Sequence, residues 1–487
     1  MERTTTFEHH LDLPVSADAA WAWHARPGAF DRLAPPWQSL RILRRNPDLS
    51  DGSELEFRIG LGPFGMRWLA RHSNVEPGVG FVDEQIRGPF ASWRHEHRFE
   101  AIDDASCRLI DRVDYRLPLS TLSDRLAGGF VHGDLTALFA WRRRVTSGDL
   151  SLHGGLGRRF GDRPRRVAIS GLSGTIGRTL AAMLSTGGHH VVRIVRGTAG
   201  SSSPASPWTE VGWDGSRFDH PDRLEHLDAF VDLAGEPIAV RWTPARRRRI
   251  LASRTERVTA ILGALGELAS PPKAFLCASG VGIYGDTGSS VVDENADTAS
   301  ADGFLADVAR RWEAAAADAT AFGARVAHLR FGIVLSPRGG ALPKLLGPAP
   351  FGPLAIPGSG RQHVAWITLD DAAAAIVHAV HDSDLTGPVN VTAPQPLTMA
   401  DLVRALGEAT GRPVVGRVPA VVLRRLLGPM AEETVLRSTG AAPGRLLDRG
   451  FTFRDTDPVG ALRVLLGRAR GPRHGSAETL SLSEVSR

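Results

Sequence analysis

The chain has 487 residues, of which 42% are hydrophobic and 23% are charged, and its net charge is +5 at pH 7. At about 150 residues per domain this length predicts about three domains, and the composition excludes global disorder. No run approaches the about 18 consecutive apolar residues that span a bilayer, and the first residues lack the pattern of a signal peptide. Cys107 and Cys277 lie too far apart for a disulfide framework or a zinc ribbon. We therefore expect a soluble, cytoplasmic protein without membrane insertion.

The basic residues do not predict a nucleic-acid partner, although the pI is near 9.9. Only two of the 58 basic residues are lysines, Lys273 and Lys344. The densest arginine run, 246–249, lies in a segment whose apolar residues recur with helical spacing. We interpret this run as a solvated helix face.

Residues 1–150 form the first expected domain, in which tryptophan and histidine are concentrated in alternating segments. Between residues 92 and 100, aromatic and histidine side chains alternate with charged ones, and the segments 68–72 and 113–117 repeat this rhythm. Apolar residues at helical spacing follow between residues 135 and 145. We therefore expect a curved antiparallel sheet around a long helix, which together enclose an apolar cup.

This pattern, with the helix expected at 21–24, resembles the helix-grip fold of START-like and polyketide-cyclase-like (SRPBCC) domains over residues 4–148. The resemblance implies a cup for a hydrophobic small molecule, lined by His72, Trp93, His95 and His97. The alternative is that the histidines are core residues with partners inside the domain. We expect no metal at His95 and His97, because sequence spacing fixes no carboxylate or third histidine nearby.

The remainder of the chain has a different organisation. The glycines of 151–164 predict a linker. Short apolar segments then alternate with Ala- and Leu-rich segments over 165–412, which is typical of an α/β fold with a Rossmann-type parallel sheet. A small C-terminal substrate domain is expected at 413–468 and a polar, loose tail at 469–487.

The segment 166–184 has the order of strand, glycine-rich turn and helix that a dinucleotide site requires. Gly171, Gly174 and Gly177 allow a tight turn and a close approach to a pyrophosphate, and the free amides of the helix start, at Thr175 and Ile176, stabilise its charge. The sequence therefore predicts cofactor binding at this turn.

The second strand, 190–196, favours NADP(H) over NAD(H). An NAD site usually has Asp or Glu about 20 residues after the glycines, where it binds the ribose hydroxyls. This chain has no acidic residue between Asp162 and Glu210. Arg196 lies instead at the strand end, where it is placed to pair with a 2′-phosphate.

The glycine spacing is similar to that of the extended short-chain dehydrogenase/reductase superfamily. Further segments resemble its uncharacterised "epimerase family" of atypical members, some of which are labelled cell-division inhibitors, over about residues 165–466. These segments are 231–238, 241–243, 253–254, 278–286, 304–306, 312–314, 330–335 and 360–367. The resemblance implies further cofactor contacts at Leu233, Ala234 and Gly235.

The standard proton relay of that superfamily, a tyrosine with a lysine four residues later, is absent. Tyr284 is the only candidate tyrosine in this part of the chain, and Gly288 stands four residues after it. Ser279 and Tyr284 still lie at the carboxyl end of an expected strand, where α/β proteins bind ligands. Ser279 either contacts a carbonyl or the nicotinamide, or caps the strand. Tyr284 either acts as an acid or lies against the cofactor.

Three polar residues are further substrate candidates. Arg330, Arg361 and Gln362 either hold an anionic substrate group or are solvated at the surface.

These features predict an NADP(H)-dependent oxidoreductase or epimerase-like enzyme that acts on a hydrophobic small molecule held by the N-terminal domain. The alternative is a catalytically degenerate NADP(H)-sensing protein with a protein partner, linked to cell division. The missing tyrosine and lysine pair favours the alternative, whereas the polar residues at the strand ends favour the enzyme.

Overall fold

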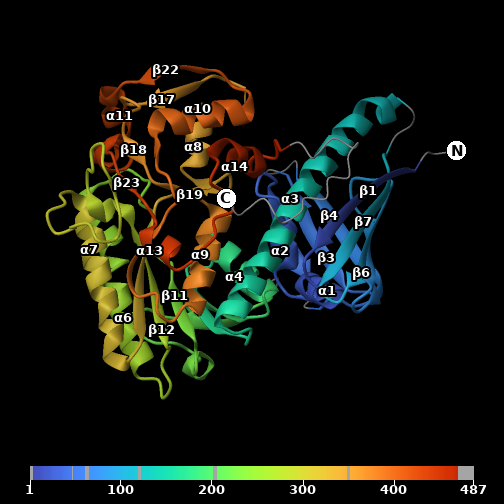
Figure 1. Ribbon diagram of the computed structural model, residues 1–487, viewed down its shortest axis with the longest axis horizontal. Coiled ribbons are helices and arrows are strands. Elements are labelled where there is room, and N and C mark those ends of the chain that lie inside the picture. The colour runs from blue at the N-terminus through green and yellow to red at the C-terminus, as the bar shows by residue number, and fades with distance from the viewer. Residues whose placement is uncertain are drawn as a thin grey trace.

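The computed structural model describes residues 4–46, 48–60, 65–118, 122–200, 206–347 and 351–469. An antiparallel sheet wrapped against a long helix stands beside a larger body that is built around a parallel sheet (Figure 1). The expected arrangement of an α/β Rossmann-type body preceded by an α+β helix-grip domain is confirmed. In the part of the chain that the structure describes, no helix combines the length and apolarity needed to cross a membrane.

The N-terminal domain is a seven-stranded antiparallel sheet in the order β1-β7-β6-β5-β4-β3-β2. The long helix α3 lies along the sheet, and its apolar side chains face the inner surface of β1 and β7. The elements are β1 Thr5–Leu13, α1 Ala17–Ala25, α2 Ala29–Leu33, β2 Leu40–Arg45, β3 Glu54–Ile59, β4 Met66–Glu76, β5 Gly80–Arg87, β6 Ser92–Asp103, β7 Ser106–Arg116 and α3 Leu122–Phe160.

The linker expected at 151–164 is helical as far as Phe160, because α3 continues through it. Leu152, Leu156 and Phe160 recur at helical spacing and pack on the core of the parallel sheet. Burial of this apolar stripe outweighs the low helix propensity of the intervening glycines. One helix therefore closes the cup with its first half and contacts the second domain with its last turns.

The second domain is a parallel sheet in the order β10-β9-β8-β11-β12-β14-β20, with helices on both faces (Figure 1). One face is covered by α4, α9 and the end of α3, and the other by α6 and α7. The strands are β8 Arg166–Ser170, β9 His190–Arg196, β10 Thr209–Trp213, β11 Ala229–Asp232, β12 Ala274–Gly280, β14 Arg325–Phe331 and β20 Gly387–Val391. The helices are α4 Thr175–Thr186, η2 Pro221–Leu224, α5 Pro244–Ala252, α6 Glu256–Gly266, η3 Val281–Tyr284, α7 Phe304–Ala317, η4 Asp318–Phe322 and α9 Leu369–His381.

A third core draws on both sides of the boundary expected at 412. Residues of 335–366 share this core with α10 and α14, and β22 pairs with β17. The elements are β13 Val291–Val292, β15 Ile333–Ser336, β16 Gly339–Gly340, α8 Leu342–Leu346, β17 Leu354–Pro357, β18 His363–Val364, β19 Trp366–Thr368, β21 Leu397–Thr398, α10 Met399–Thr410, β22 Val414–Val418, α11 Ala420–Leu427, α12 Pro429–Ala431, η5 Glu432–Leu436, β23 Gly440–Ala441, α13 Gly444–Asp448 and α14 Pro458–Leu465. From residue 470 on, the tail expected at 469–487 lies outside the described residues.

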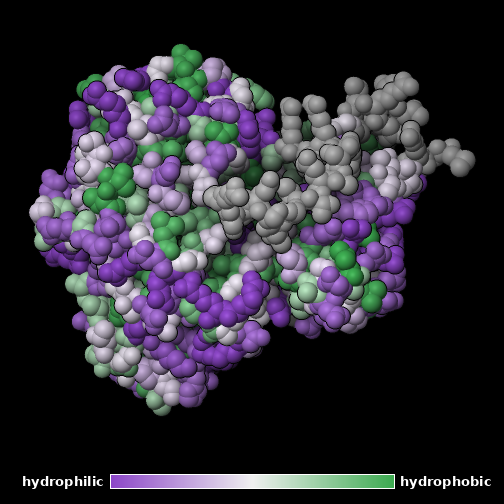
Figure 2. All heavy atoms as spheres, in the orientation of Figure 1, coloured by the Kyte–Doolittle hydropathy of each residue, from purple (hydrophilic) through white to green (hydrophobic). Residues whose placement is uncertain are grey.

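The face of the molecule drawn in Figure 2 is mostly hydrophilic. Hydrophobic side chains form small separate patches on it, one of them over β22, where Val415 is exposed. Such scattered apolar side chains are ordinary for a folded protein.

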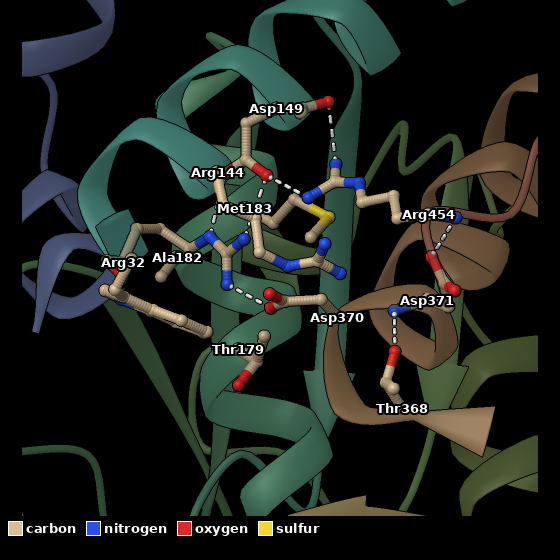
Figure 3. A network of polar contacts seen from close by, with 12 residues as sticks. Arg32, Arg144, Asp149, Thr179, Ala182, Met183, Thr368, Asp370, Asp371 and Arg454 are labelled. Atoms are coloured by element: carbon tan, nitrogen blue, oxygen red, sulfur yellow. Dashed lines mark hydrogen bonds and ion pairs between the residues drawn. The ribbon is translucent and has the colours of Figure 1, made fainter. Parts of the chain in front are cut away.

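A buried network of charges joins the two domains (Figure 3). The Arg32 guanidinium of α2 donates to both carboxylate oxygens of Asp149 on α3, at 2.7 and 2.9 Å, and to Asp370 of α9 at 2.7 Å. Arg454 donates to Asp149 from the other side at 2.9 Å. Arg32 is only 3% exposed and Asp149 is fully buried, so these charges depend on one another. We call this network the joint.

We expect Arg32→Met to lower the free energy of unfolding by about 3–5 kcal/mol, because it leaves buried carboxylates without their cation. Urea unfolding followed by circular dichroism measures this change. The control is Asp12→Asn, which breaks an exposed pair with Arg108 and is expected to cost less than about 1 kcal/mol. Equal losses in both variants would show that the joint is energetically unimportant.

Candidate functional site

The glycine-rich turn connects β8 to α4. Two of its glycines are required because a side chain would not fit, and the third begins the helix. Gly171 has a φ of +76°, and a Cβ there would lie 2.7 Å from the Ala234 amide nitrogen. A Cβ on Gly177 would lie 2.6 Å from the Gly171 carbonyl oxygen. Gly174 begins α4 without a side-chain cap, which leaves the amides of the first turn available to an anion.

The segment after β11 is fixed beside this turn by a buried carboxylate. Asp232 accepts a short hydrogen bond from Ser170 and one of 2.6 Å from Arg257. Arg257 also donates to the Ala234 carbonyl at 2.8 Å. Of the predicted cofactor contacts, Leu233 and Ala234 lie against Gly171 of the turn, whereas Gly235 faces the Arg254 side chain. The sequence assigned no role to Asp232 or Arg257, because they are far apart in the chain and form their ion pair only when the protein is folded.

Arg196 ends β9 and its side chain is exposed. It forms no hydrogen bond or ion pair with the residues that the structure describes, whereas Arg193 is paired with Glu210 at 3.0 Å. Of the two arginines of β9, Arg196 is therefore the one whose guanidinium has no partner among the described residues. It is also the one that lies where a 2′-phosphate of the ribose is expected.

A chain of polar contacts crosses the carboxyl ends of β12, β14 and β20. Ser279 donates to Glu313 at 2.7 Å, and Arg330 binds both oxygens of the same carboxylate at 2.8 Å. Arg330 also donates to the Tyr284 hydroxyl at 2.9 Å, which in turn donates to Asn390 Oδ1 at 2.8 Å. The structure thus brings Ser279 and Tyr284 into one network.

Sequence reasoning missed two members of this network, Glu313 and Asn390. Glu313 lies in one of the segments on which the family resemblance rests, but Asn390 carries no sequence signal. Arg330, expected to hold an anionic substrate group, has its guanidinium occupied by Glu313 and Tyr284.

The Tyr284 hydroxyl is protonated at neutral pH. Burial raises its pKa above the usual value of 10, and the nearby Arg330 only partly opposes this shift. Because Glu313 neutralises Arg330, the guanidinium is a weak substitute for the lysine of the standard relay. Tyr284 is therefore suited to donate a hydrogen bond or a proton, and not to act as a phenolate.

The remaining substrate candidates differ in their surroundings. Gln362 is buried and donates to the carbonyls of Pro357 and Val435, both at 3.0 Å, while Ser359 donates to its side-chain oxygen. Its amide is thus used within the fold, and its burial excludes the alternative that Gln362 is solvated at the surface, while its substrate contact stays a prediction. Arg361 is exposed.

The N-terminal domain holds a cavity of about 530 Å³, a size typical of small-molecule sites. All four residues expected to line the cup, His72, Trp93, His95 and His97, are on its wall. The apolar wall is formed mainly by α2, the strands β3 and β4, and the first half of α3.

The cup histidines are paired with two carboxylates, the buried Asp111 and the partly exposed Asp83. Antiparallel register places His72 and His95 opposite Asp83, and His97 opposite Asp111. His72 and His97 lie 2.9 and 3.3 Å from Asp83, and His97 and His95 lie 2.8 and 3.0 Å from Asp111. The histidines therefore line the cavity and have partners inside the domain, and their contact with a ligand stays a prediction.

A third potential metal ligand does lie beside His95 and His97, contrary to the sequence argument. Asp83, His95 and His97 each offer one ligand atom, and these atoms lie within 4.8 Å of one another. Spacing along the chain missed Asp83 because it comes from the neighbouring strand.

The fold and the site together define an NAD(P)-binding Rossmann-type protein with a small C-terminal domain and an N-terminal helix-grip domain. Residues 167–391 match the NAD dependent epimerase/dehydratase family, residues 13–142 match polyketide cyclase / dehydrase and lipid transport, and residues 418–465 match a domain of unknown function, DUF1731.

The chain belongs to the epimerase family proteins. It is 39% identical to Epimerase family protein Mb2239 of Mycobacterium bovis over 59% of this chain and 93% of that protein. A structure described as a nucleoside-diphosphate sugar epimerase from Corynebacterium glutamicum covers 96% of this chain and 91% of its own, with 31% identity and a TM-score of 0.74. The structure of human epimerase family protein SDR39U1 with NADPH covers 62% of this chain and all of its own, with 29% identity and a TM-score of 0.54. The family resemblance drawn from the sequence is confirmed.

We expect Gly177→Ala to weaken NADPH binding about tenfold or more, because the added Cβ meets the Gly171 carbonyl and overpacking costs about 1–3 kcal/mol. Calorimetric titration with NADPH measures the affinity. Gly263→Ala in α6 is the matched control, since a Cβ there meets nothing within 4 Å. An unchanged affinity in Gly177→Ala would remove the turn from the cofactor site.

Proposed function

We propose that the protein is an NADP(H)-dependent oxidoreductase or epimerase-like enzyme that acts on a hydrophobic small molecule held by its N-terminal domain. The observation that carries the proposal is the combination of an open glycine turn with Arg196 at the end of β9, in a segment without acidic residues. The description of the human relative as an NADPH complex supports the same choice of cofactor.

The residues present fit a dinucleotide. The uncapped start of α4 offers backbone amides to the pyrophosphate, and the absence of a side chain at Gly171 lets the segment of Leu233 and Ala234 pack closely against the turn. Arg196 is free to pair with a 2′-phosphate. When bound, NADP(H) supplies or accepts a hydride.

Ser279 and Tyr284 supply the polar groups for the substrate in this proposal. Glu313 orients the Ser279 hydroxyl, and Arg330 and Asn390 hold the Tyr284 hydroxyl from two sides. With its pKa raised by burial, Tyr284 acts as the acid that protonates an oxygen of the substrate. Glu313, Arg330 and Asn390 are positioning residues.

The cup is connected to the cofactor turn through α2. Residues of α2 line the cavity on one side and pack on α4 on the other. A second connection runs through Arg338, which donates to the Ala34 carbonyl just after α2 at 3.0 Å. The next residue, Gly339, lies beside Thr175 of the cofactor turn, since a Cβ there would be 3.5 Å from Thr175 Oγ1. This contiguity supports a role for the cup in presenting substrate to the same enzyme.

We place the protein in the cytoplasm. The buried, unpaired Cys107 and Cys277 suit this reducing compartment.

A second candidate function is an NADP(H)-sensing protein that acts on a protein partner without turnover. The raised pKa of Tyr284 and the glycine four residues after it favour this alternative. Oxidation of NADPH by the purified protein with 2-octanone or 2-cyclohexenone supports the enzyme. Tight NADPH binding without oxidation by any apolar ketone or enone supports the sensor.

We expect Arg196→Asp to weaken NADPH about 30-fold or more, through loss of a charge-assisted hydrogen bond and added repulsion, and to change NADH affinity little. Parallel calorimetric titrations with the two cofactors measure this difference. Arg217→Asp makes the same charge change at an exposed turn after β10 and serves as the control. Equal losses for both cofactors would contradict the role in 2′-phosphate binding.

We expect Tyr284→Phe to lower kcat about 100-fold or more while the Kd for NADPH stays unchanged, because only the proton donor is removed. Steady-state kinetics with a ketone that supports turnover, combined with calorimetry, separate the two effects. Full activity in the variant would mean that Tyr284 only lies against the cofactor.

A further inference from the structure

At one end of the cup, Arg142 of α3 lies on the cavity wall with Asp83 and with His72, His95 and His97. Asp111, which lines a small adjacent pocket with Arg142, contacts His95 and His97. Burial alone would raise the pKa of both carboxyls, but the histidine contacts outweigh burial and hold both pKa values well below the usual range. Both carboxylates are therefore ionised.

The pKa values of the four nearby histidines shift in two directions. Burial lowers the pKa of His72 and His97, but the contacts with Asp83 and Asp111 exceed this effect, so both pKa values are raised. Burial lowers the pKa of His95 and of the neighbouring His24 to about 4. The two oxygens of Asp83 thus lie beside His72 and His97, and Asp111 lies beside His95 and His97.

Arg142 is the arginine that lies beside these histidines on the cavity wall. It extends from α3 to the cavity wall, where its guanidinium carbon lies 5.2 Å above the Phe139 ring. Its Nε atom is buried without a hydrogen-bond partner, and the guanidinium makes no hydrogen bond or ion pair with the described residues. Burial lowers its pKa, yet an arginine remains protonated under such conditions. A guanidinium in this state is a ready partner for an anion from the cavity.

We propose that the cup binds an amphipathic acid, an apolar molecule with a single carboxylate that pairs with Arg142. This inference rests on the proposed function, in which the cup is the ligand-holding module, and it names the substrate class. The planar guanidinium matches the shape and charge of a carboxylate. Asp83 does not repel such a ligand, since both of its oxygens face histidines.

The rest of the cavity suits the apolar part of the ligand. Its wall includes Phe30, Leu55, Phe57, Trp68 and Phe90, and its volume accommodates a molecule of lipid or drug size. The acid therefore lies with its carboxylate near the histidines and its apolar body along α2 and β3.

The test compares two fluorescent probes of the same shape, cis-parinaric acid and the corresponding alcohol, on the full-length protein. We expect the acid to bind about tenfold or more tightly than the alcohol, because only the acid forms a charge-assisted hydrogen bond. This comparison needs no variant, so it stands even if a substitution in the cup prevents folding.

Arg142→Met removes the charge and retains much of the side-chain length. We expect it to abolish the preference for the acid and to leave alcohol binding and NADPH binding unchanged, while Arg142→Lys keeps part of the preference. The matched control is Arg98→Met on the outer face of β6, where the side chain is 60% exposed. It is expected to bind both probes as the native chain does.

The outcomes separate this inference from the proposed function. Equal binding of acid and alcohol to the native chain overturns the inference and leaves the cup as a site for neutral apolar ligands. Binding of neither probe overturns both proposals. A preference for the acid that appears only with added Zn²⁺ also overturns the inference, since Asp83, His95 and His97 would then hold the anion through a metal ion.

Discussion

The buried joint is the interaction on which the arrangement of the whole molecule depends. Arg32, Asp149, Asp370 and Arg454 come from four segments, and each is costly to bury unless the other three are in place. The network therefore permits one docking geometry and penalises others, as an apolar contact would not. It fixes α2 against α4, and through α2 it fixes the cup beside the cofactor turn.

The chemistry at the strand ends follows from competition between burial and charge. A lysine beside a tyrosine lowers the tyrosine pKa only if its own charge is not already neutralised. Arg330 has the charge and the proximity, but both carboxylate oxygens of Glu313 accept hydrogen bonds from one edge of its guanidinium. Burial then controls Tyr284, and the site favours proton donation over phenolate chemistry.

Local sequence patterns were sufficient for the glycine turn, for the alternating strands and for the closing helix. The turn is recognisable because Gly171 and Gly177 satisfy constraints that are set within a few residues of chain. The pairing of His95 with Asp111 and of Arg330 with Glu313 was not recognisable, because it depends on register and on packing between separate elements. The helical path of 151–160 was missed because the glycines there concealed an apolar stripe that only the second domain buries.

The position of α2 has a thermodynamic consequence for the two ligand sites. This five-residue helix is at once part of the cup wall and part of the support of α4. If a cup ligand displaced α2 and this changed the affinity of the turn for the cofactor, the cofactor would change the affinity of the cup by the same factor. The two sites would then be coupled without a direct contact between their ligands.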